Sequence, residues 1–199
     1  MDEPGGRLIH EEELRAADSP QAQCVALSRQ RDGDKWRIRA ADSPQAQCSA
    51  LSHFTATGFV FNAREEVLLV KHRKLGVWLP PGGHVEENEL PDDAVLREIR
   101  EETGVTADIL PNRLGIVPSG CRELETPFLI LLEDIAGDGS HNHIDLIYLC
   151  TTQDETLTPD YSEVDDAAWF TESGLEGLET FENVLQTAEK AFAAVRNLS

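Results

Sequence analysis

Basic residues are scarce in this chain of 199 residues, which has 17 lysines and arginines against 37 aspartates and glutamates and a formal net charge of −20. A protein that binds a nucleic-acid polymer needs clustered basic side chains to neutralise phosphates. A protein that binds membrane surfaces through a polybasic segment has the same need. The composition therefore excludes both kinds of partner.

Long apolar runs, paired cysteines and an export signal are also missing. Apolar runs reach five residues, as in Phe128–Leu132, whereas a membrane-spanning helix needs about 20. The four cysteines contain no Cys-x-x-Cys pair, so a zinc ribbon is not expected. Residues 1–7 lack the basic and then apolar order of a secretory signal. We therefore expect a cytoplasmic protein with free thiols and no membrane contact, and a homodimer is left open.

The N-terminal quarter of the chain contains one 14-residue segment twice. Residues 15–28 and 39–52 differ only at Val25 and Ser49, and two copies are too few for a solenoid. Each copy places Asp and Ser before a proline, an order typical of helix starts. We therefore expect an N-terminal extension, residues 1–52, of two short helices joined by a charged loop at 29–34. The repeat is either a docking arm for a partner or a local tandem duplication with no chemical role, and we favour the duplication.

The pattern over residues 53–199 predicts a single α/β domain. Pro80–Gly83 predicts a loop, because prolines and glycines interrupt strands. Helices are predicted at 92–103, between Pro91 and Gly104, and at about 181–196. Strands interleaved with two helices predict a mixed sheet between helices, an α/β/α sandwich. The predicted strands are 53–61, 67–71, 105–116, 127–135, 144–151 and 167–170.

Negative charge is densest over residues 83–105, which hold eight acidic and two basic residues. On the predicted helix Glu98, Glu101 and Glu102 are spaced i, i+3 and i+4, so their carboxylates share one face. Carboxylates that close repel one another, and a hard divalent cation with oxygen ligands relieves the repulsion. A solvated acidic face is the alternative, but it leaves the preceding glycine loop unexplained.

The same residues resemble a known motif. Gly83 is followed after five residues by Glu89, and after seven more by the run Arg97 to Val105, Arg-Glu-Ile-Arg-Glu-Glu-Thr-Gly-Val. This resembles the complete Nudix box, G-x5-E-x7-R-E-U-x-E-E-x-G-U with U aliphatic, at all nine constrained positions. The order of strands over residues 53–196 is also similar to the Nudix fold, and residues 1–52 lie outside the resemblance.

The resemblance implies a MutT-like hydrolase, a pyrophosphatase that cleaves a nucleoside diphosphate joined to another group by attack of water on phosphorus. In similar enzymes Mg²⁺ (or Mn²⁺) is bound by the glutamates of the box, here Glu98, Glu101 and Glu102, and by a glycine carbonyl, here that of Gly82. A non-catalytic module that binds nucleotides on the same fold is the alternative.

Further roles follow from the resemblance. Arg97 is expected to pair with the acidic side chains and orient them, with Glu89 as its partner. Glu163 stands where some MutT-like members carry a further acid from a late loop. One carboxylate must act as general base; we favour Glu98, with Glu163 as the rival.

Expectations for substrate contacts rest on residues around the loop. Lys71 and Arg73 belong to a basic run that either grips phosphates or forms a solvated strand end. Gly83 and His84 are the first two residues of the box and are expected to touch the substrate. The choice among nucleotide derivatives stays open.

Two smaller patterns have ordinary explanations. The run from His141 to Asp145 is either a metal cluster or the polar part of a hairpin, and the hairpin is favoured. Phe59 and Trp78 are expected in the core rather than stacked on a base.

Overall fold

The computed structural model describes residues 27–32, 35–40, 51–135, 137–138 and 140–197, and the chain divides into two units, Met1–Ser49 and Ala50–Ser199. In the first unit β1 (Leu27–Asp32) pairs antiparallel with β2 (Lys35–Ala40). The prediction of a loop is therefore wrong for residues 29–32. The polar–apolar alternation along β2 is typical of strands. At their described ends the two sequence copies are strand rather than helix, and the rest of the two expected helices lies outside the described residues.

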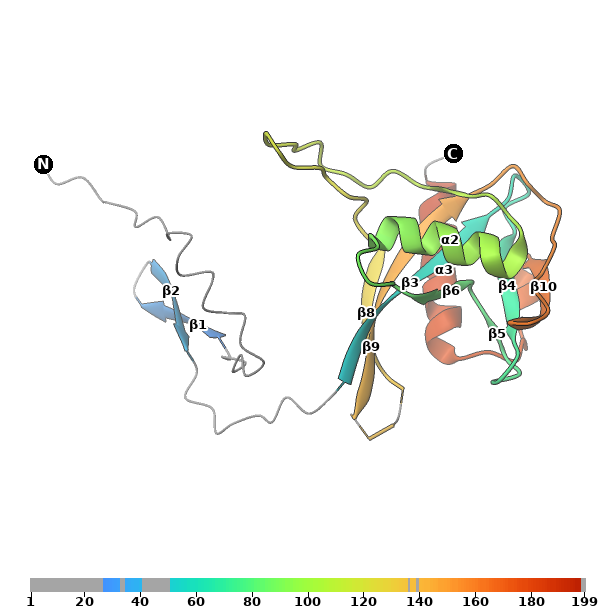
Figure 1. Ribbon diagram of the computed structural model, residues 1–199, viewed down its shortest axis with the longest axis horizontal. Helices are drawn as coiled ribbons and strands as arrows, with labels where there is room; N and C mark the ends of the chain where they lie inside the picture. Colours follow the sequence, from blue (N-terminus) through green and yellow to red (C-terminus); the bar gives the residue numbers. More distant parts are fainter. Residues whose placement is uncertain (1–26, 33–34, 41–50, 136, 139, 198–199) are drawn as a thin grey trace, which may run out of the picture. The chain divides into compact units, whose positions relative to one another are not determined.

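The second unit is built on a mixed sheet of eight strands (Figure 1). The strand order is β10–β4–β3–β9–β7, with β5 beside β4, β6 beside β3 and β8 beside β9. Strands β3 and β9 run parallel and pair along their whole length, whereas the other pairs are antiparallel. The strands are β3 (Leu51–Phe61), β4 (Val67–His72), β5 (Trp78–Leu79), β6 (Gly82–His84), β7 (Asp108–Ile109), β8 (Leu129–Asp134), β9 (His141–Thr151) and β10 (Val164–Phe170).

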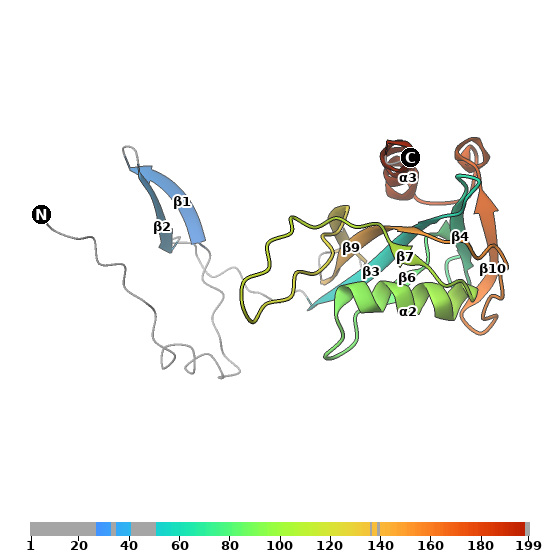
Figure 2. The ribbon, with the colours of Figure 1, turned by 90° about the horizontal axis from the view of Figure 1, so that it is seen from above.

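Two helices cover the two faces of this sheet, which confirms the α/β/α sandwich (Figure 2). Helix α2 (Pro91–Thr103) packs on one face and α3 (Glu182–Arg196) on the other, with a short 3₁₀ turn, η2 (Glu172–Leu175), before α3. Because alternate residues of a strand face opposite sides, β3 supplies both cores. Its buried side chains are Ala56 and Val60 beside α2, and Phe59 and Phe61 beside α3.

Two sequence predictions about irregular segments are wrong in part. The strand predicted at 105–116 is reduced to β7, because Pro111 has no N–H to donate and the following amides bond elsewhere. The carboxylate of Glu123 accepts hydrogen bonds from the backbone N–H groups of residues 114–116, at 2.7–3.1 Å. The loop predicted at Pro80–Gly83 ends earlier, since Gly82 and Gly83 pair with β3 as part of β6.

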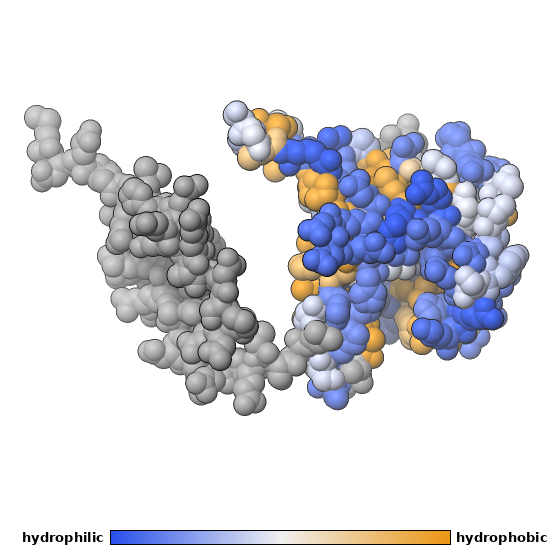
Figure 3. All heavy atoms as spheres, in the orientation of Figure 1, coloured by the Kyte–Doolittle hydropathy of each residue, from blue (hydrophilic) through white to orange (hydrophobic). Residues whose placement is uncertain are grey.

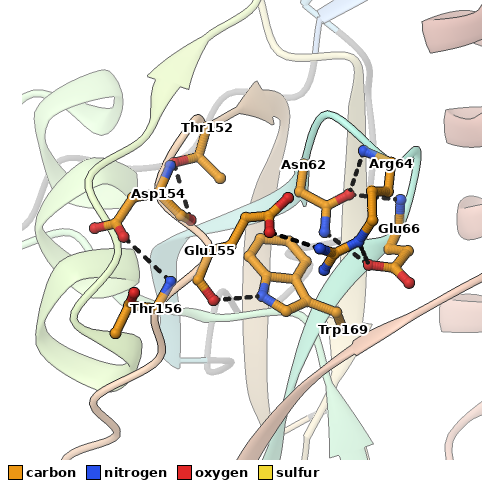
Figure 4. A network of polar contacts seen from close by, with 8 residues as sticks. All are labelled: Asn62, Arg64, Glu66, Thr152, Asp154, Glu155, Thr156 and Trp169. Carbon is orange, nitrogen blue, oxygen red and sulfur yellow. Dashed lines mark hydrogen bonds and ion pairs between the residues drawn. The ribbon is translucent and has the colours of Figure 1, made fainter.

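The loop that follows β9 is fastened at several points. Arg64, in the β3–β4 turn, donates to the Glu155 carboxylate at 2.6 Å, and the Trp169 indole N–H donates to the Glu155 carbonyl at 3.2 Å (Figure 4). Farther along, the N–H of Thr158 donates to the Thr103 carbonyl at 2.8 Å, and that of Asp160 to the Glu102 carbonyl at 3.2 Å. The loop is thus held against the C-terminal end of α2.

Other sequence expectations concern membranes and cysteines. Within the described residues no helix combines the length and apolar character that crossing a membrane requires. Cys121 and Cys150 are free thiols, whereas Cys24 and Cys48 lie outside the described residues. Burial raises the pKa of Cys150, so this thiol is a packing residue rather than a nucleophile.

Candidate active site

Helix α2 presents the acidic residues of the motif. Pro91 occupies its first turn, where a missing N–H costs nothing, and Asp92 and Asp93 complement the positive end of the helix dipole. Gly104 ends the helix at φ 76°, a left-handed conformation that glycine adopts freely. Figure 3, viewed from the side of α2, shows hydrophilic residues gathered over this helix.

Arg97 is the centre of an ion-pair network. Its Nε and Nη2 donate to the two carboxylate oxygens of Glu89, each at 2.8 Å, which confirms the expected partner. Its Nη1 donates to Glu98 at 2.8 Å and to Glu101 at 3.0 Å. Its Nη2 also donates to the carbonyl of His84 at 3.1 Å. A planar guanidinium can make these contacts at once, so Arg97 ties the loop before α2 to the helix itself.

Glu102 is the most buried carboxylate of the site. Its Oε2 accepts a hydrogen bond from the backbone N–H of Gly82 at 3.1 Å. The pKa of Glu102 is raised to about 8: burial is the largest cause, the Gly82 hydrogen bond opposes it, and the negative charges of Glu98 and Glu163 add to it. A buried carboxylate this costly to ionise is typical of a functional site.

Glu98 lies directly against the glycine loop. A Cβ on Gly83 would collide with the carboxylate of Glu98, so only glycine leaves this carboxylate in its place. Burial raises the pKa of Glu98, with Glu101 and Glu163 adding repulsion and Arg97 opposing it. Gly83 therefore faces α2.

Glu163 joins the site from the far end of the chain. The loop that carries it is held to α2 through the carbonyls of Glu102 and Thr103. Its charge contributes to the raised pKa of both Glu98 and Glu102. The structure thus brings Glu98, Glu102 and Glu163 close enough for the charge of Glu163 to act on both other carboxyl groups.

The basic side chains of residues 71–74 have different surroundings in the structure. Arg73 donates to the Tyr161 carbonyl and lies 3.9 Å from the Asp165 carboxylate, so it supports the loop that carries Glu163. Lys71 is half-buried at the end of β4. His72 and Lys74, rather than these two residues, line the cavity described next.

A cavity of about 410 Å³ opens on the α3 side of the sheet, within the range typical of small-molecule sites. Thr57 and Pro80 line the part of the cavity next to β6, because Thr57 pairs with Gly82 of that strand. Phe59 lines the cavity while remaining in the core, as expected. Trp78 also packs in the core, with its ring 5.0 Å from that of Phe170.

No sequence pattern indicates a polar cavity here; the sequence points to Asp145 only as part of the run from His141, whose place in the β8–β9 hairpin is confirmed. Asp145 accepts hydrogen bonds from the hydroxyls of Thr55 and Thr57, each at 2.9 Å. Glu133 accepts one from the Asn183 amide at 2.9 Å. Burial raises the pKa of both carboxyl groups. No motif links these residues, which come from β3, β8, β9 and α3, so only the folded sheet reveals them.

The sequence profile of the NUDIX domain matches residues 51–189, which include every residue of the site described above. The chain belongs to the Nudix family. Several of its relatives are named as hydrolases or diphosphatases, and residues 51–189 of this chain form its Nudix domain.

Relatives of this Nudix domain agree in family and differ in substrate name. A putative 8-oxo-dGTP diphosphatase of Bacillus subtilis is 40% identical over 57 residues, or 29% of this chain and 38% of its own length. An m7GpppN-mRNA hydrolase of Xenopus laevis is 35% identical over 123 residues, 55% of this chain and 38% of its own. The matches thus span well under half of these two relatives.

Among solved structures, a NUDIX-family hydrolase from Clostridium perfringens is 32% identical with a TM-score of 0.64. The likeness covers 72% of this chain and 97% of that one. A MutT protein from Methanosarcina mazei, 17% identical with a TM-score of 0.57 over 75% of this chain and 99% of its own, shares the fold.

The donor groups of the Nudix box suit a hard divalent cation. Glu98 and Glu102 are carboxylates that burial and neighbouring negative charges make costly to ionise, and a cation removes that cost. In the described part of the chain no three acidic, histidine or cysteine side chains already stand close enough to hold a metal. Arg97 instead engages Glu98 and Glu101, so a cation would compete with it for these carboxylates.

Proposed function

We propose that this Nudix domain hydrolyses a pyrophosphate linkage in a nucleoside diphosphate joined to another group, in a reaction that depends on a divalent metal ion. The observation that carries the proposal is a pair of carboxylates, the half-buried Glu98 and the buried Glu102, whose pKa values are raised beside a glycine loop without room for a side chain. Such a pair is unfavourable unless a cation neutralises it.

Glu98, Glu101, Glu102 and the carbonyl of Gly82 would hold Mg²⁺ (or Mn²⁺), the ions that carboxylate and carbonyl oxygens suit best. When bound, the metal offsets the charge of the diphosphate, polarises phosphorus and lowers the pKa of water. Positioning and charge neutralisation then account for most of the catalysis, as in other phosphoryl chemistry.

The chain's own residues position and activate the water. Glu98 accepts a proton from water as the water oxygen forms a bond to phosphorus, and the bridging P–O bond breaks with its electron pair leaving on the departing phosphate. Glu163 is the alternative base, since its charge reaches both Glu98 and Glu102. Arg97 is a positioning residue, because it contacts the acidic side chains and holds them in place.

The nucleoside would occupy the cavity on the α3 side. This cavity offers hydrogen-bonding groups from Glu133, Asp145 and Asn183. Its wall at Pro80 borders the glycine loop, which connects this side of the sheet to the box on α2. The relatives' names include an oxidised nucleotide and an mRNA cap, which supports a nucleotide and leaves its identity open.

The proposal is tested by measuring product release from a panel of nucleoside diphosphate derivatives with Mg²⁺ and with Mn²⁺. We expect turnover of at least one derivative, and a fall in kcat of about 10²-fold or more in Glu98→Gln if Glu98 is the base. A larger fall in Glu163→Gln would transfer that role to Glu163. Glu87→Gln, an exposed carboxylate of the same loop, is the matched control. Binding of nucleotides without any turnover would instead support the non-catalytic module.

A further inference from the structure

Four histidines gather on the sheet face opposite the box. His53 lies on β3, His84 on β6, and His141 and His143 on β9. The parallel register sets His53 beside His143, and β6 adds His84 beside Thr55, two residues along β3. His84 follows Gly83, whose missing side chain faces α2. Successive residues of a strand point to opposite faces, so the imidazole of His84 turns away from the carboxylates.

The rings form a closed cycle of near neighbours. Ring centroids are 5.4 Å apart for His53 and His84, 4.8 Å for His84 and His143, 5.1 Å for His143 and His141, and 5.2 Å for His141 and His53. Across the cycle, the rings of His53 and His143 are 6.5 Å apart.

These spacings match imidazoles that share one metal ion. With a metal–nitrogen bond of about 2.1 Å, each ring centroid lies about 3.2 Å from the metal. Two such centroids are then about 5.2 Å apart at a tetrahedral angle and about 6.4 Å apart on opposite sides of the ion. The 6.5 Å diagonal is too long for a regular tetrahedron, so the cycle fits a flattened one whose centroids lie at least about 3.3 Å from the ion, slightly beyond the ideal distance.

Within the part of the chain that the structure describes, two ring nitrogens of the cluster also lack hydrogen-bond partners. Among the described residues, Nε2 of His141 and Nε2 of His143 are buried and make no hydrogen bond. Such orphaned nitrogens are costly, and an ion would satisfy them. Burial and the neighbouring histidines lower the pKa of His143, which favours the neutral form that a metal requires.

We propose that His53, His84, His141 and His143 form a second metal site, which takes a late first-row transition-metal ion such as Zn²⁺. The nitrogen donors distinguish it from the oxygen donors of the box, since imidazole suits these metals and not Mg²⁺. The side chains as placed do not yet converge on a point, so binding involves rotation of the rings about their side-chain bonds. A bound ion would tie β6, and with it the glycine loop, to β3 and β9.

The test is titration of the full chain with Zn²⁺ in excess Mg²⁺, followed by calorimetry and by NMR of the histidine rings. We expect one Zn²⁺ per chain, shifts of the imidazole signals of the four histidines, and an unmoved signal from His72, which lies outside the cluster. Mg²⁺ alone should leave the four signals in place. Co²⁺ should give the visible absorption of a four-coordinate site.

Variants separate this site from the box. His141→Ala and His143→Ala should each weaken Zn²⁺ binding by more than about tenfold, while His72→Ala and Glu102→Gln should keep it. Signals of the wild-type rings that do not respond to Zn²⁺ would overturn the proposal, and so would equal affinity in correctly folded His141→Ala and His143→Ala. Loss of binding in Glu102→Gln would assign the ion to the box instead. Each result is independent of whether the box hydrolyses nucleotides.

Discussion

Replacing Glu102 with glutamine tests two claims separately: that the buried charge destabilises the folded protein, and that the carboxylate is a ligand for the metal. In the metal-free protein the pKa of Glu102 is raised from 4.5 to about 8. A carboxyl group with a raised pKa in the folded state contributes stability that is complete below pH 4.5 and is lost as the pH rises through about 8. At about 1.4 kcal/mol per pKa unit the loss is at most about 5 kcal/mol, and water that enters around the charged group reduces it.

Glutamine stays neutral at every pH and retains an oxygen that can accept from the Gly82 N–H. In EDTA we therefore expect Glu102→Gln and the wild type to unfold within about 1 kcal/mol of each other near pH 5. At pH 9 the variant should be more stable by about 2–4 kcal/mol, a rise in Tm of roughly 4–16 °C. Urea unfolding and calorimetry at the two pH values measure both quantities.

Added Mg²⁺ should reverse the order, because the wild type gains a ligand and the variant loses one. Turnover in Glu102→Gln should fall by more than about tenfold, while Glu87→Gln should follow the wild type throughout. A variant that is less stable than the wild type at pH 9 without metal would refute the argument from burial. Equal stabilisation of both proteins by Mg²⁺ would refute the role of Glu102 as a ligand.

Two further substitutions test the frame around the carboxylates. Arg97→Lys cannot keep the paired hydrogen bonds to Glu89 together with those to Glu98, so we expect a loss of about 1–3 kcal/mol in the free energy of unfolding by urea. Arg64→Lys, at an exposed ion pair, is the control and should cost under about 1 kcal/mol; equal losses would contradict the central position of Arg97. Gly83→Ala pushes the Glu98 carboxylate aside, and because that group is the end of a flexible side chain, Tm should change little while kcat falls by about 10²-fold. An unchanged kcat would show that catalysis does not depend on the position of the Glu98 carboxylate.

The sequence predicts the local parts of this structure well. The limits of α2 follow from Pro91 and Gly104, and the pairing of Arg97 with Glu89 follows from the motif. These features depend on residues close together in the chain, where turn and helix geometry decide the outcome. The long-range placement of Glu163 was also expected, on the basis of resemblance rather than spacing.

Features that depend on distant pairing escaped prediction. His53 lies beside His143, 90 residues later in the chain, only because β3 and β9 pair in parallel. No local sequence pattern encodes that register. Asp145 and Glu133 enter the cavity for the same reason. After β7 the sequence predicts a longer strand than the structure has. The Glu123 carboxylate accepts hydrogen bonds from the amides of residues 114–116, which a neighbouring strand would otherwise have bound.

Hydrolysis in ¹⁸O-labelled water tests the central claim most directly. If water attacks phosphorus in a reaction that needs a divalent metal, ¹⁸O enters one phosphate-containing product, and EDTA abolishes the turnover. Mass spectrometry and ³¹P NMR of both products also show which phosphorus is attacked. Turnover that persists in EDTA, or cleavage that leaves both phosphate products without ¹⁸O, would contradict the mechanism proposed for Glu98 and Glu102.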